Sequence, residues 1–322
     1  MTADTNIHNK ILLETGTNEL EIITFFLRWY DAKRKKYVNT YYGINAAKVS
    51  ELIAVPEEIT HTPNSPESVK GVFMLREKTI PLIDICNWFQ YDPDVSEEAK
   101  KKWTVIVTEL NGKFFGFLSH GVDKVYRTSW TSILPPHELI ASSNSLTGMV
   151  LIENNLIQMI DFENITASID PGLKMKLLDE ASGHENVFAD SGKVVVIADD
   201  SRVIRDLLKN VLETANFAVV EHSDGLMCWD YLQEIKKQGP AHNKILAIIS
   251  DIEMPQMDGH NLCLRIKEDS AFDKIPVILF SSMINDALHK KGVKVGADAQ
   301  ITKPELNRLV QTTIDLIAKY QG

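Results

Sequence analysis

The amino-acid sequence predicts a multidomain protein, with an all-β domain followed by an α/β domain built on a doubly wound parallel sheet. Its 322 residues suit about two domains of roughly 150 residues each. Short runs of β-branched and aromatic residues, separated by turn signals, occupy the chain up to residue 170. Beyond residue 193, apolar strand-like runs alternate with amphipathic helical patterns, which is typical of a parallel sheet covered by helices.

Hairpins account for most of the first domain. Residues 20–30 are rich in β-branched and aromatic side chains and predict a long strand. Residues 104–120 place Asn111-Gly112 between two apolar runs, which is the strongest short-range signal for a hairpin. Residues 148–161 repeat this pattern around Asn154-Asn155, and residues 71–85 predict a third hairpin that turns near Glu77-Lys78. Many short strands with tight turns favour a barrel or a sandwich.

The second domain is predicted to hold five strand–helix units. Apolar side chains recur on one face of the helical segments 201–215 and 305–320. The expected strands lie at 193–200, 217–222, 245–250, 275–282 and 297–304. The predicted bounds are therefore 1–170 for the first domain, 171–192 for a linker and 193–322 for the second domain. The linker has glycine-containing ends and a short predicted helix at 173–181, which favours mobile domains.

Composition excludes several classes of protein. The net charge is −10 and neither half is basic, which argues against nucleic-acid binding. No apolar run approaches 18 residues and the N-terminus lacks a signal pattern, so we expect no membrane insertion. The three cysteines have no metal-type spacing and suit a reducing compartment, so the sequon-like Asn164-Ile165-Thr166 carries little weight. These features predict a cytoplasmic protein.

Polar side chains close four of the five predicted strands of the second domain. Asp199-Asp200 ends the first strand, Asp251 the third, Ser281-Ser282 the fourth and Lys303-Pro304 the fifth. Sites in open α/β sheets form beyond the carboxyl ends of the strands, so these groups should meet at one edge. Each has an ordinary alternative: an acidic pair before a helix often serves only as an N-cap, and a single serine or lysine is more often merely polar. Their conjunction favours a site.

Such a set of groups suits phosphoryl chemistry. Adjacent carboxylates repel each other, and Mg²⁺, a hard cation with oxygen ligands, relieves this repulsion and binds phosphate oxygens. One carboxylate can then attack phosphorus and carry the phosphoryl group. A lysine neutralises charge on the transferred group, and a serine hydroxyl can bond to it afterwards. That new bond would bias a conformational equilibrium.

The motifs VVVIADDSRVIR, ISDIEMPQMDG, PVILFSS and ITKPE, which span about 193–322, closely resemble those of response-regulator receiver domains with a flavodoxin-like fold. The resemblance implies that Asp251 is the phosphoacceptor and that Ser281 and Lys303 are the switch hydroxyl and the lysine of the site. It also implies that Asp200 binds Mg²⁺ directly with Asp199 assisting, and that Glu253 contributes its backbone carbonyl to the metal.

Two positions bear on how such a receiver works. Many receivers place an aromatic residue shortly before the lysine, whereas this chain has Gln300, so reorientation of an aromatic ring is not expected here. Glu253 places a carboxylate two residues beyond the phosphoacceptor. We predict that it modulates hydrolysis of the acyl phosphate by repelling or orienting water.

The first domain resembles CheW-like coupling domains over about residues 15–170, through ILLETGTNELEIITF, GVFMLREKTIPLID and the hairpins after Trp103. Such domains consist of two five-stranded β-barrels without catalytic residues and bridge chemoreceptor tips to the histidine kinase CheA. Arg76 and Glu51 match positions on their docking surface, although a solvated ion pair is the alternative. Glu77 stands where that family has a glycine, which puts the turn geometry in question.

A CheW-like domain followed by a receiver is the architecture of the CheV family. The resemblance implies a non-enzymatic chemotaxis adaptor at cytoplasmic receptor arrays, with CheA, chemoreceptor tips and further CheW-like proteins as partners. Phosphorylation would act as an adaptation switch or as a phosphate sink, and both remain open. The main alternative is an Mg²⁺-dependent phosphatase with an aspartate nucleophile, but such enzymes place the nucleophile on the first motif strand and the acidic pair last. A transcription regulator would need a DNA-binding module, and a receiver used only for docking would not need the intact set of site residues.

Overall fold

The computed structural model describes residues 18–110, 112–136, 146–169, 192–282, 286–303 and 305–321. The predicted linker helix at 173–181 lies outside these residues. The chain forms two compact units. The β-rich unit comprises Glu19–Thr128 and Gly148–Ile160, and the α/β unit comprises Met1–Asn18, Ser129–Thr147 and Asp161–Gly322. This division groups residues 161–169 with the α/β unit; the domain bounds expected from the sequence stay a prediction.

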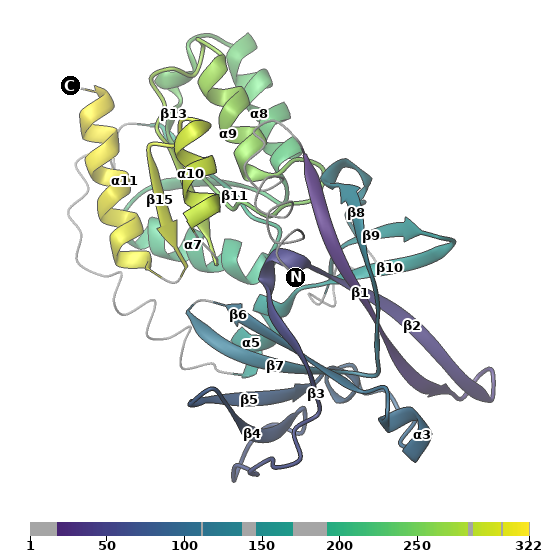
Figure 1. Ribbon diagram of the computed structural model, residues 1–322. Helices are drawn as coiled ribbons and strands as arrows, with labels where there is room; N and C mark the ends of the chain where they lie inside the picture. Colours follow the sequence, from purple (N-terminus) through teal and green to yellow (C-terminus); the bar gives the residue numbers. More distant parts are fainter. Residues whose placement is uncertain are drawn as a thin grey trace. The chain divides into compact units, whose positions relative to one another are not determined.

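Two five-stranded sheets form the β-rich part of the chain, in the orders β8-β1-β2-β10-β9 and β3-β6-β7-β5-β4 (Figure 1). The strands of the first sheet are β1 (Glu19–Asp31), β2 (Lys36–Asn45), β8 (Val122–Ser129), β9 (Leu146–Ile152) and β10 (Asn155–Ile160). Those of the second are β3 (Val49–Ala54), β4 (Val69–Leu75), β5 (Lys78–Asp84), β6 (Thr104–Leu110) and β7 (Lys113–Ser119). Two short helices, α2 (Ile85–Trp88) and α3 (Glu97–Lys100), follow β5.

The hairpins follow the turn chemistry of the sequence, with small shifts. Strands β6 and β7 pair antiparallel on either side of residues 111–112, as predicted. The β4–β5 turn lies at Arg76-Glu77, one residue earlier than predicted, and both residues have positive φ angles, of 47° and 67°. The β9–β10 turn likewise lies at Glu153-Asn154. Glu77 therefore adopts the left-handed conformation that the missing glycine would have favoured.

The α/β unit contains one parallel sheet in the order β12-β11-β13-β14-β15, the order of flavodoxin-like folds. Its strands are β11 (Val194–Ala198), β12 (Ala218–His222), β13 (Ile245–Ser250), β14 (Val277–Ser281) and β15 (Ala299–Thr302). Its helices are α5 (Phe162–Ile169), α7 (Arg202–Thr214), α8 (Gly225–Lys237), α9 (Gly259–Glu268), α10 (Asp286–Lys294) and α11 (Leu306–Gln321). The sequence patterns do not predict helices α5 and α10.

Each face of the parallel sheet packs against its own helices. Successive residues of β11 alternate between the two faces, so that Val195 and Ile197 join one core and Val196 and Ala198 the other. Helices α7 and α11 cover the first face, and α8 and α9 cover the second (Figure 1). This burial on both faces explains why the strands are continuously apolar. The predicted fold class, an all-β part with five-stranded sheets followed by a doubly wound α/β part, is confirmed.

Two further features concern the chemistry of the chain. All three cysteines are buried and none forms a disulfide. Within the described ranges, no helix is long and apolar enough to cross a membrane.

Candidate functional site

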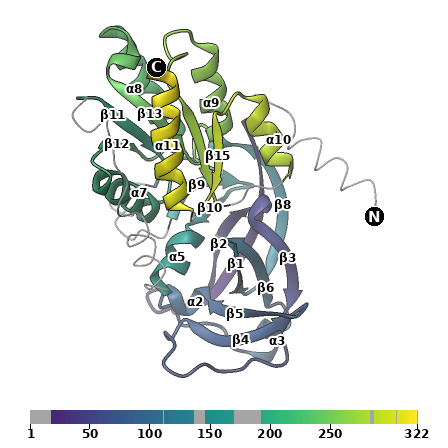
Figure 2. The same cartoon turned by 90° about the vertical axis from the view of Figure 1, so that its left-hand side faces the viewer.

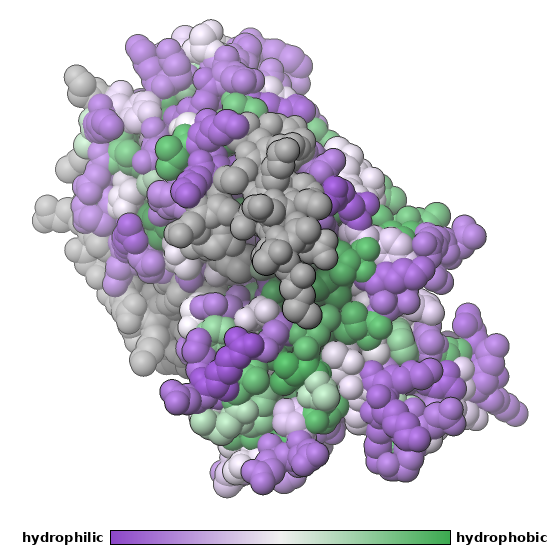
Figure 3. Space-filling view, viewed as in Figure 1, coloured by the Kyte–Doolittle hydropathy of each residue, from purple (hydrophilic) through white to green (hydrophobic). Residues whose placement is uncertain are grey.

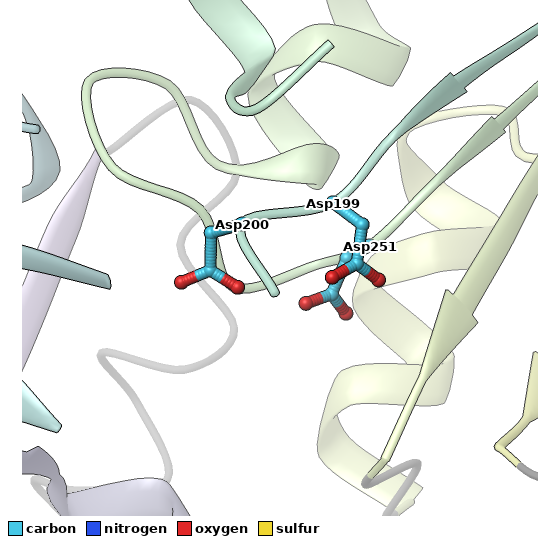
Figure 4. Close-up of side chains that lie close together, drawn as sticks. All are labelled: Asp199, Asp200 and Asp251. Carbon is cyan, nitrogen blue, oxygen red and sulfur yellow. The ribbon is translucent and has the colours of Figure 1, made fainter. Parts of the chain in front are cut away.

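Three aspartates meet at the carboxyl end of the parallel sheet. Asp199 and Asp200 directly follow β11, and Asp251 directly follows the adjacent strand β13. Carboxylate oxygens from the three side chains all lie within 4.8 Å of one another. Figure 4 shows those of Asp199 and Asp251 close together and that of Asp200 to one side. The structure thus brings together the three aspartates that the sequence placed at this edge.

Backbone groups hold the aspartates in place. The carboxylate of Asp199 accepts a hydrogen bond from the amide of Ser201 at 2.9 Å, and that of Asp251 accepts one from Ile252 at 2.7 Å. Arg205, on α7, donates to the carbonyl oxygens of Asp199 and Asp200 at 2.7 and 3.1 Å. The segment that carries the acidic pair is therefore fixed to the first turns of α7.

Lys303 is the cationic centre of the site. It follows β15, its side chain is 2% exposed, and its Nζ lies 2.8 Å from Asp199 Oδ2 and 3.5 Å from Asp251 Oδ2. A third carboxylate oxygen, Glu163 Oε2, lies 3.3 Å from the same Nζ. Burial alone would lower the pKa of Lys303, but these three carboxylates together raise it well above its ordinary value. The lysine is therefore held in its charged form.

The acidic groups outnumber the positive charge that faces them. Burial is the largest of the effects that raise the pKa of Asp199 to about 7. The charges of Asp251 and Glu163 contribute to the same rise, and Lys303 opposes it. One ammonium thus faces the carboxylates of Asp199, Asp251 and Glu163, with Asp200 close by. Oxygen donors with excess negative charge suit a hard divalent cation such as Mg²⁺, so the donor set fits the metal that the sequence predicted. The predicted contribution of Glu253 is its backbone carbonyl, and its side chain is not part of the three-aspartate cluster.

The other predicted residues also lie in this unit. Ser281 is the last residue of β14 and is 2% exposed, and its carbonyl oxygen accepts the Lys303 amide at 2.9 Å. Glu253 is 7% exposed in the loop between β13 and α9. The side-chain amide of Gln300 donates to the carbonyl oxygen of His289 at 2.9 Å, which joins β15 to α10.

A cavity of about 580 Å³ opens beside the acidic cluster. Asp200, Arg202, Arg205 and Asp161 contribute to its lining, together with Pro135. Its lining also includes Asp206, Glu221 and Asp224, so acidic side chains outnumber the two arginines there.

Arg76 and Glu51 form an ion pair in the β-rich unit. Arg76 Nη2 lies 3.1 Å from Glu51 Oε2, with side chains 79% and 24% exposed. Glu51 belongs to β3 and Arg76 follows β4, and these are the two edge strands of one sheet. The exposed apolar side chains Leu52 and Met74 come from the same two strands. Figure 3 shows apolar surface on the face of this unit where β3 and β6 are drawn.

Sequence reasoning missed Glu163 and Arg205. Glu163 lies 140 residues before Lys303, and a lone glutamate after an apolar run carries no signal for such a contact. Arg205 has the spacing of an ordinary exposed helix residue relative to the apolar face of α7. Its contacts with the carbonyl groups of Asp199 and Asp200 depend on the tight turn between β11 and α7.

Comparisons with known proteins match both parts of the chain. Residues 37–170 match the CheW-like domain, and residues 195–314 match the response regulator receiver domain. The chemotaxis protein CheV3 of Helicobacter pylori is 33% identical over 312 residues, which cover 94% of this chain and 96% of that protein. The similarity therefore runs through both parts.

Solved structures match one part each. The scaffolding protein TtCheW from Thermoanaerobacter tengcongensis is 23% identical, with a TM-score of 0.37, and covers 44% of this chain and 84% of its own. The receiver domain of a signal transduction histidine kinase from Syntrophus aciditrophicus is 27% identical, with a TM-score of 0.35, and covers 39% of this chain and 91% of its own.

Proposed function

Because this chain belongs to the CheV family of chemotaxis proteins, which join a CheW-like domain to a receiver domain, we propose that it couples chemoreceptors to the histidine kinase CheA under control of phosphorylation at Asp251. Its partners are CheA, the cytoplasmic tips of chemoreceptors and further CheW-like proteins. It works at cytoplasmic receptor arrays, as an adaptor and not as an enzyme.

One observation carries the proposal for Asp251. Its carboxylate lies against Lys303 Nζ at 3.5 Å and within 4.8 Å of the oxygens of Asp199 and Asp200. In phosphoryl transfer from a phosphohistidine, an oxygen of Asp251 attacks phosphorus and forms a P–O bond. The P–N bond breaks at the same time, and the released imidazole nitrogen takes up a proton. Hydrolysis later returns the free carboxylate and inorganic phosphate.

The other residues act on the transferred group. Lys303 neutralises one of its oxygens, and the Ser281 hydroxyl donates a hydrogen bond to another. Asp199, Asp200 and Asp251, with the carbonyl of Glu253, would hold Mg²⁺. When bound, the metal neutralises charge on the phosphoryl oxygens. The new contacts at Ser281 and Lys303 exist only with the phosphoryl group present, and such differential contacts shift a conformational equilibrium.

The direct test is covalent. We expect the full chain, incubated with acetyl phosphate and Mg²⁺, to gain the mass of one phosphoryl group at Asp251, and chelation of the metal to prevent this. Asp251→Asn should abolish the added mass. Asp315→Asn is the matched control and should behave as the parent, because Asp315 is exposed on α11, where its side chain accepts a hydrogen bond from Gln311. A phosphoryl group on another residue, or none, contradicts the proposal.

Two further measurements decide between alternatives. Steady turnover of a small phosphate ester by the purified chain would favour the phosphatase alternative. Kinase output in a reconstituted receptor–CheA assembly, measured with Asp251→Ala and with parent protein held in the phosphorylated form, separates a switch from a phosphate sink. A switch gives a locked output in the phosphorylated form, whereas a sink loses its effect once turnover stops.

A further inference from the structure

Helix α5 lies outside the five strand–helix repeats of the receiver and yet contacts its phosphorylation site. It packs against α7, as Figure 2 also shows, and its residue Glu163 makes the ion pair with Lys303. The two side chains are 5% and 2% exposed. Glu163, which lies outside the five strand–helix repeats, thus pairs with Lys303, the lysine that would bind the phosphoryl group.

Local hydrogen bonds shape α5 so that it presents this glutamate. Asp161 accepts the amide of Asn164 at 2.9 Å and so caps the start of the helix. Residues Phe162 to Thr166 are all buried. The helix has only eight residues, which is too short for stability in water on its own. Its order therefore depends on contacts such as that between Glu163 and Lys303.

In the present arrangement, Lys303 cannot pair with both Glu163 and a phosphoryl group. An ammonium has three donors, and three carboxylates, those of Asp199, Asp251 and Glu163, already surround this one. A phosphoryl group on Asp251 carries three acceptor oxygens and a charge of about −1.5 to −2, in place of the single negative charge of the Asp251 carboxylate. The buried carboxylate of Glu163 would then face more negative charge than before and compete with three phosphoryl oxygens for Lys303.

A second contact ties the same site to segments that precede the receiver. Gln256 lies in the loop between Asp251 and α9, and its backbone N–H donates a hydrogen bond to the carbonyl oxygen of Trp130 at 2.9 Å. The carbonyl oxygen of Gln256 accepts the side-chain amide of Asn18 at 2.9 Å. Asn18 directly precedes β1, and Trp130 directly follows β8. The loop that begins at the phosphoacceptor is therefore bonded to residues covalently next to strands of the first sheet.

We propose that α5 is an intramolecular ligand of the phosphoryl site, bound through Glu163 while Asp251 is unphosphorylated and released when Asp251 carries a phosphoryl group. The inference rests on the proposed function, because it requires phosphorylation at Asp251. Only Asp161 separates α5 from β10. Release of α5 consequently frees the chain at the end of a strand of the CheW-like part, which provides a covalent route from the receiver to the coupling domain.

Hydrogen exchange of the full chain tests the release. Intact mass first establishes that acetyl phosphate and Mg²⁺ have phosphorylated Asp251. Peptides that cover 161–169 should then exchange faster than in the unphosphorylated chain, whereas Asp251→Asn under the same conditions should show no change. Unchanged exchange in a chain with phosphorylated Asp251 overturns this inference alone. Failure to phosphorylate Asp251 overturns the proposed function instead, and the mass measurement distinguishes the two.

The variant Glu163→Gln tests the contact without phosphorylation. It keeps the size of the side chain and removes the charge that pairs with Lys303. We expect faster exchange at 161–169 in the unphosphorylated variant and severalfold faster phosphorylation by acetyl phosphate, because one negative charge near the phosphodonor is gone. Glu305→Gln, which removes an exposed ion pair with Arg308, is the matched control. If Glu163→Gln matches the parent in both exchange and phosphorylation rate, the inference is wrong.

Discussion

Gly259 lies directly against the carbonyl oxygen of Asp251. A Cβ atom at this position would overlap that oxygen, and the next nearest atoms are also backbone, at Asp251 and Ile252. The Gly259 amide donates to the carbonyl oxygen of Ile252 at 2.8 Å, which closes the loop after β13. The first residue of α9 thus sets the backbone position of the candidate phosphoacceptor. Position 259 requires glycine because the backbone of Asp251 approaches it closely, and not because of its φ angle, which is not positive.

Gly259→Ala should therefore disturb the site more than a typical helix substitution. The overlap is with backbone, which cannot move aside cheaply, so we expect a loss of about 1–3 kcal/mol in the free energy of unfolding of the α/β unit. Phosphorylation by acetyl phosphate should slow at least severalfold. Gly292→Ala on α10 is the control, because the three atoms nearest to a Cβ there belong to the flexible side chain of Gln300 and not to backbone. Equal behaviour of the two variants in urea unfolding and phosphorylation would contradict this reasoning.

Lys303→Met should make the α/β unit dependent on divalent cations. Without the ammonium, the buried carboxylates of Asp199, Asp251 and Glu163 lose their common partner, at a cost of about 3–5 kcal/mol in metal-free buffer. Mg²⁺ should restore part of this stability, so the rise in Tm with Mg²⁺ should be larger than for the parent.

The matched control for the magnesium effect is Lys267→Met. That lysine pairs with Asp298 at 2.6 Å and is likewise largely buried, with a side chain 17% exposed. It should lose stability without gaining a larger response to Mg²⁺. If the two variants respond equally to Mg²⁺ in thermal unfolding, the carboxylates around Lys303 are not the metal site.

The parts of this site that could be predicted are those fixed by strand order. Asp199, Asp200, Asp251 and Lys303 each follow a strand, and parallel strands bring their carboxyl ends to one edge whatever the loops do. Glu163 could not be predicted, because nothing local to it indicates a partner 140 residues away. It sits on a short helix whose position depends on packing against α7 and not on its own periodicity.

Turns and weak helices were predicted less well than strands for a related reason. The turn at Arg76-Glu77 adopts positive φ angles without glycine or asparagine, because the antiparallel pairing of β4 and β5 imposes a tight two-residue connection. Helix α10 was not assigned from the sequence. In both places tertiary context outweighs the local preferences of the residues.

Glu253→Ala should change the rate at which the acyl phosphate hydrolyses, by severalfold. Glu253 lies two residues beyond Asp251 and is buried, and the prediction follows from this closeness in the sequence. A faster rate in the variant means that the carboxylate repels incoming water, and a slower rate means that it orients water. Loss of phosphorylated protein after removal of acetyl phosphate, followed by mass, gives the rate. An unchanged rate would rule out either role.

Arg76→Ala should weaken partner binding while leaving stability nearly unchanged. The arginine is 79% exposed, so loss of its pair with Glu51 should cost less than about 1 kcal/mol. Incorporation into receptor–CheA assemblies, measured by co-sedimentation, should fall. Arg127→Ala removes a comparable exposed pair, with Glu21 at 2.9 Å, and is the control. Normal incorporation of Arg76→Ala would mean that Arg76 only forms a solvated ion pair with Glu51 and does not contribute to partner binding.

His260 should make the α/β unit less stable in mild acid. It is 2% exposed, its Nε2 has no hydrogen-bond partner among the described residues, and burial, reinforced by the charge of Lys291, lowers its pKa to about 3. In the unfolded chain a histidine binds a proton near pH 6.5, so below that pH the unfolded state binds more protons than the folded state. The contribution is therefore intact above pH 6.5 and is lost as the pH falls toward 3. It amounts to about 2 kcal/mol between pH 7 and pH 5. Urea unfolding measures the free energy of unfolding at these two pH values, and its change with pH should be smaller for His260→Gln than for the parent. The control His289→Gln, at an exposed histidine, should show the same change as the parent. A parent-like change in His260→Gln would mean that other groups cause the acid sensitivity.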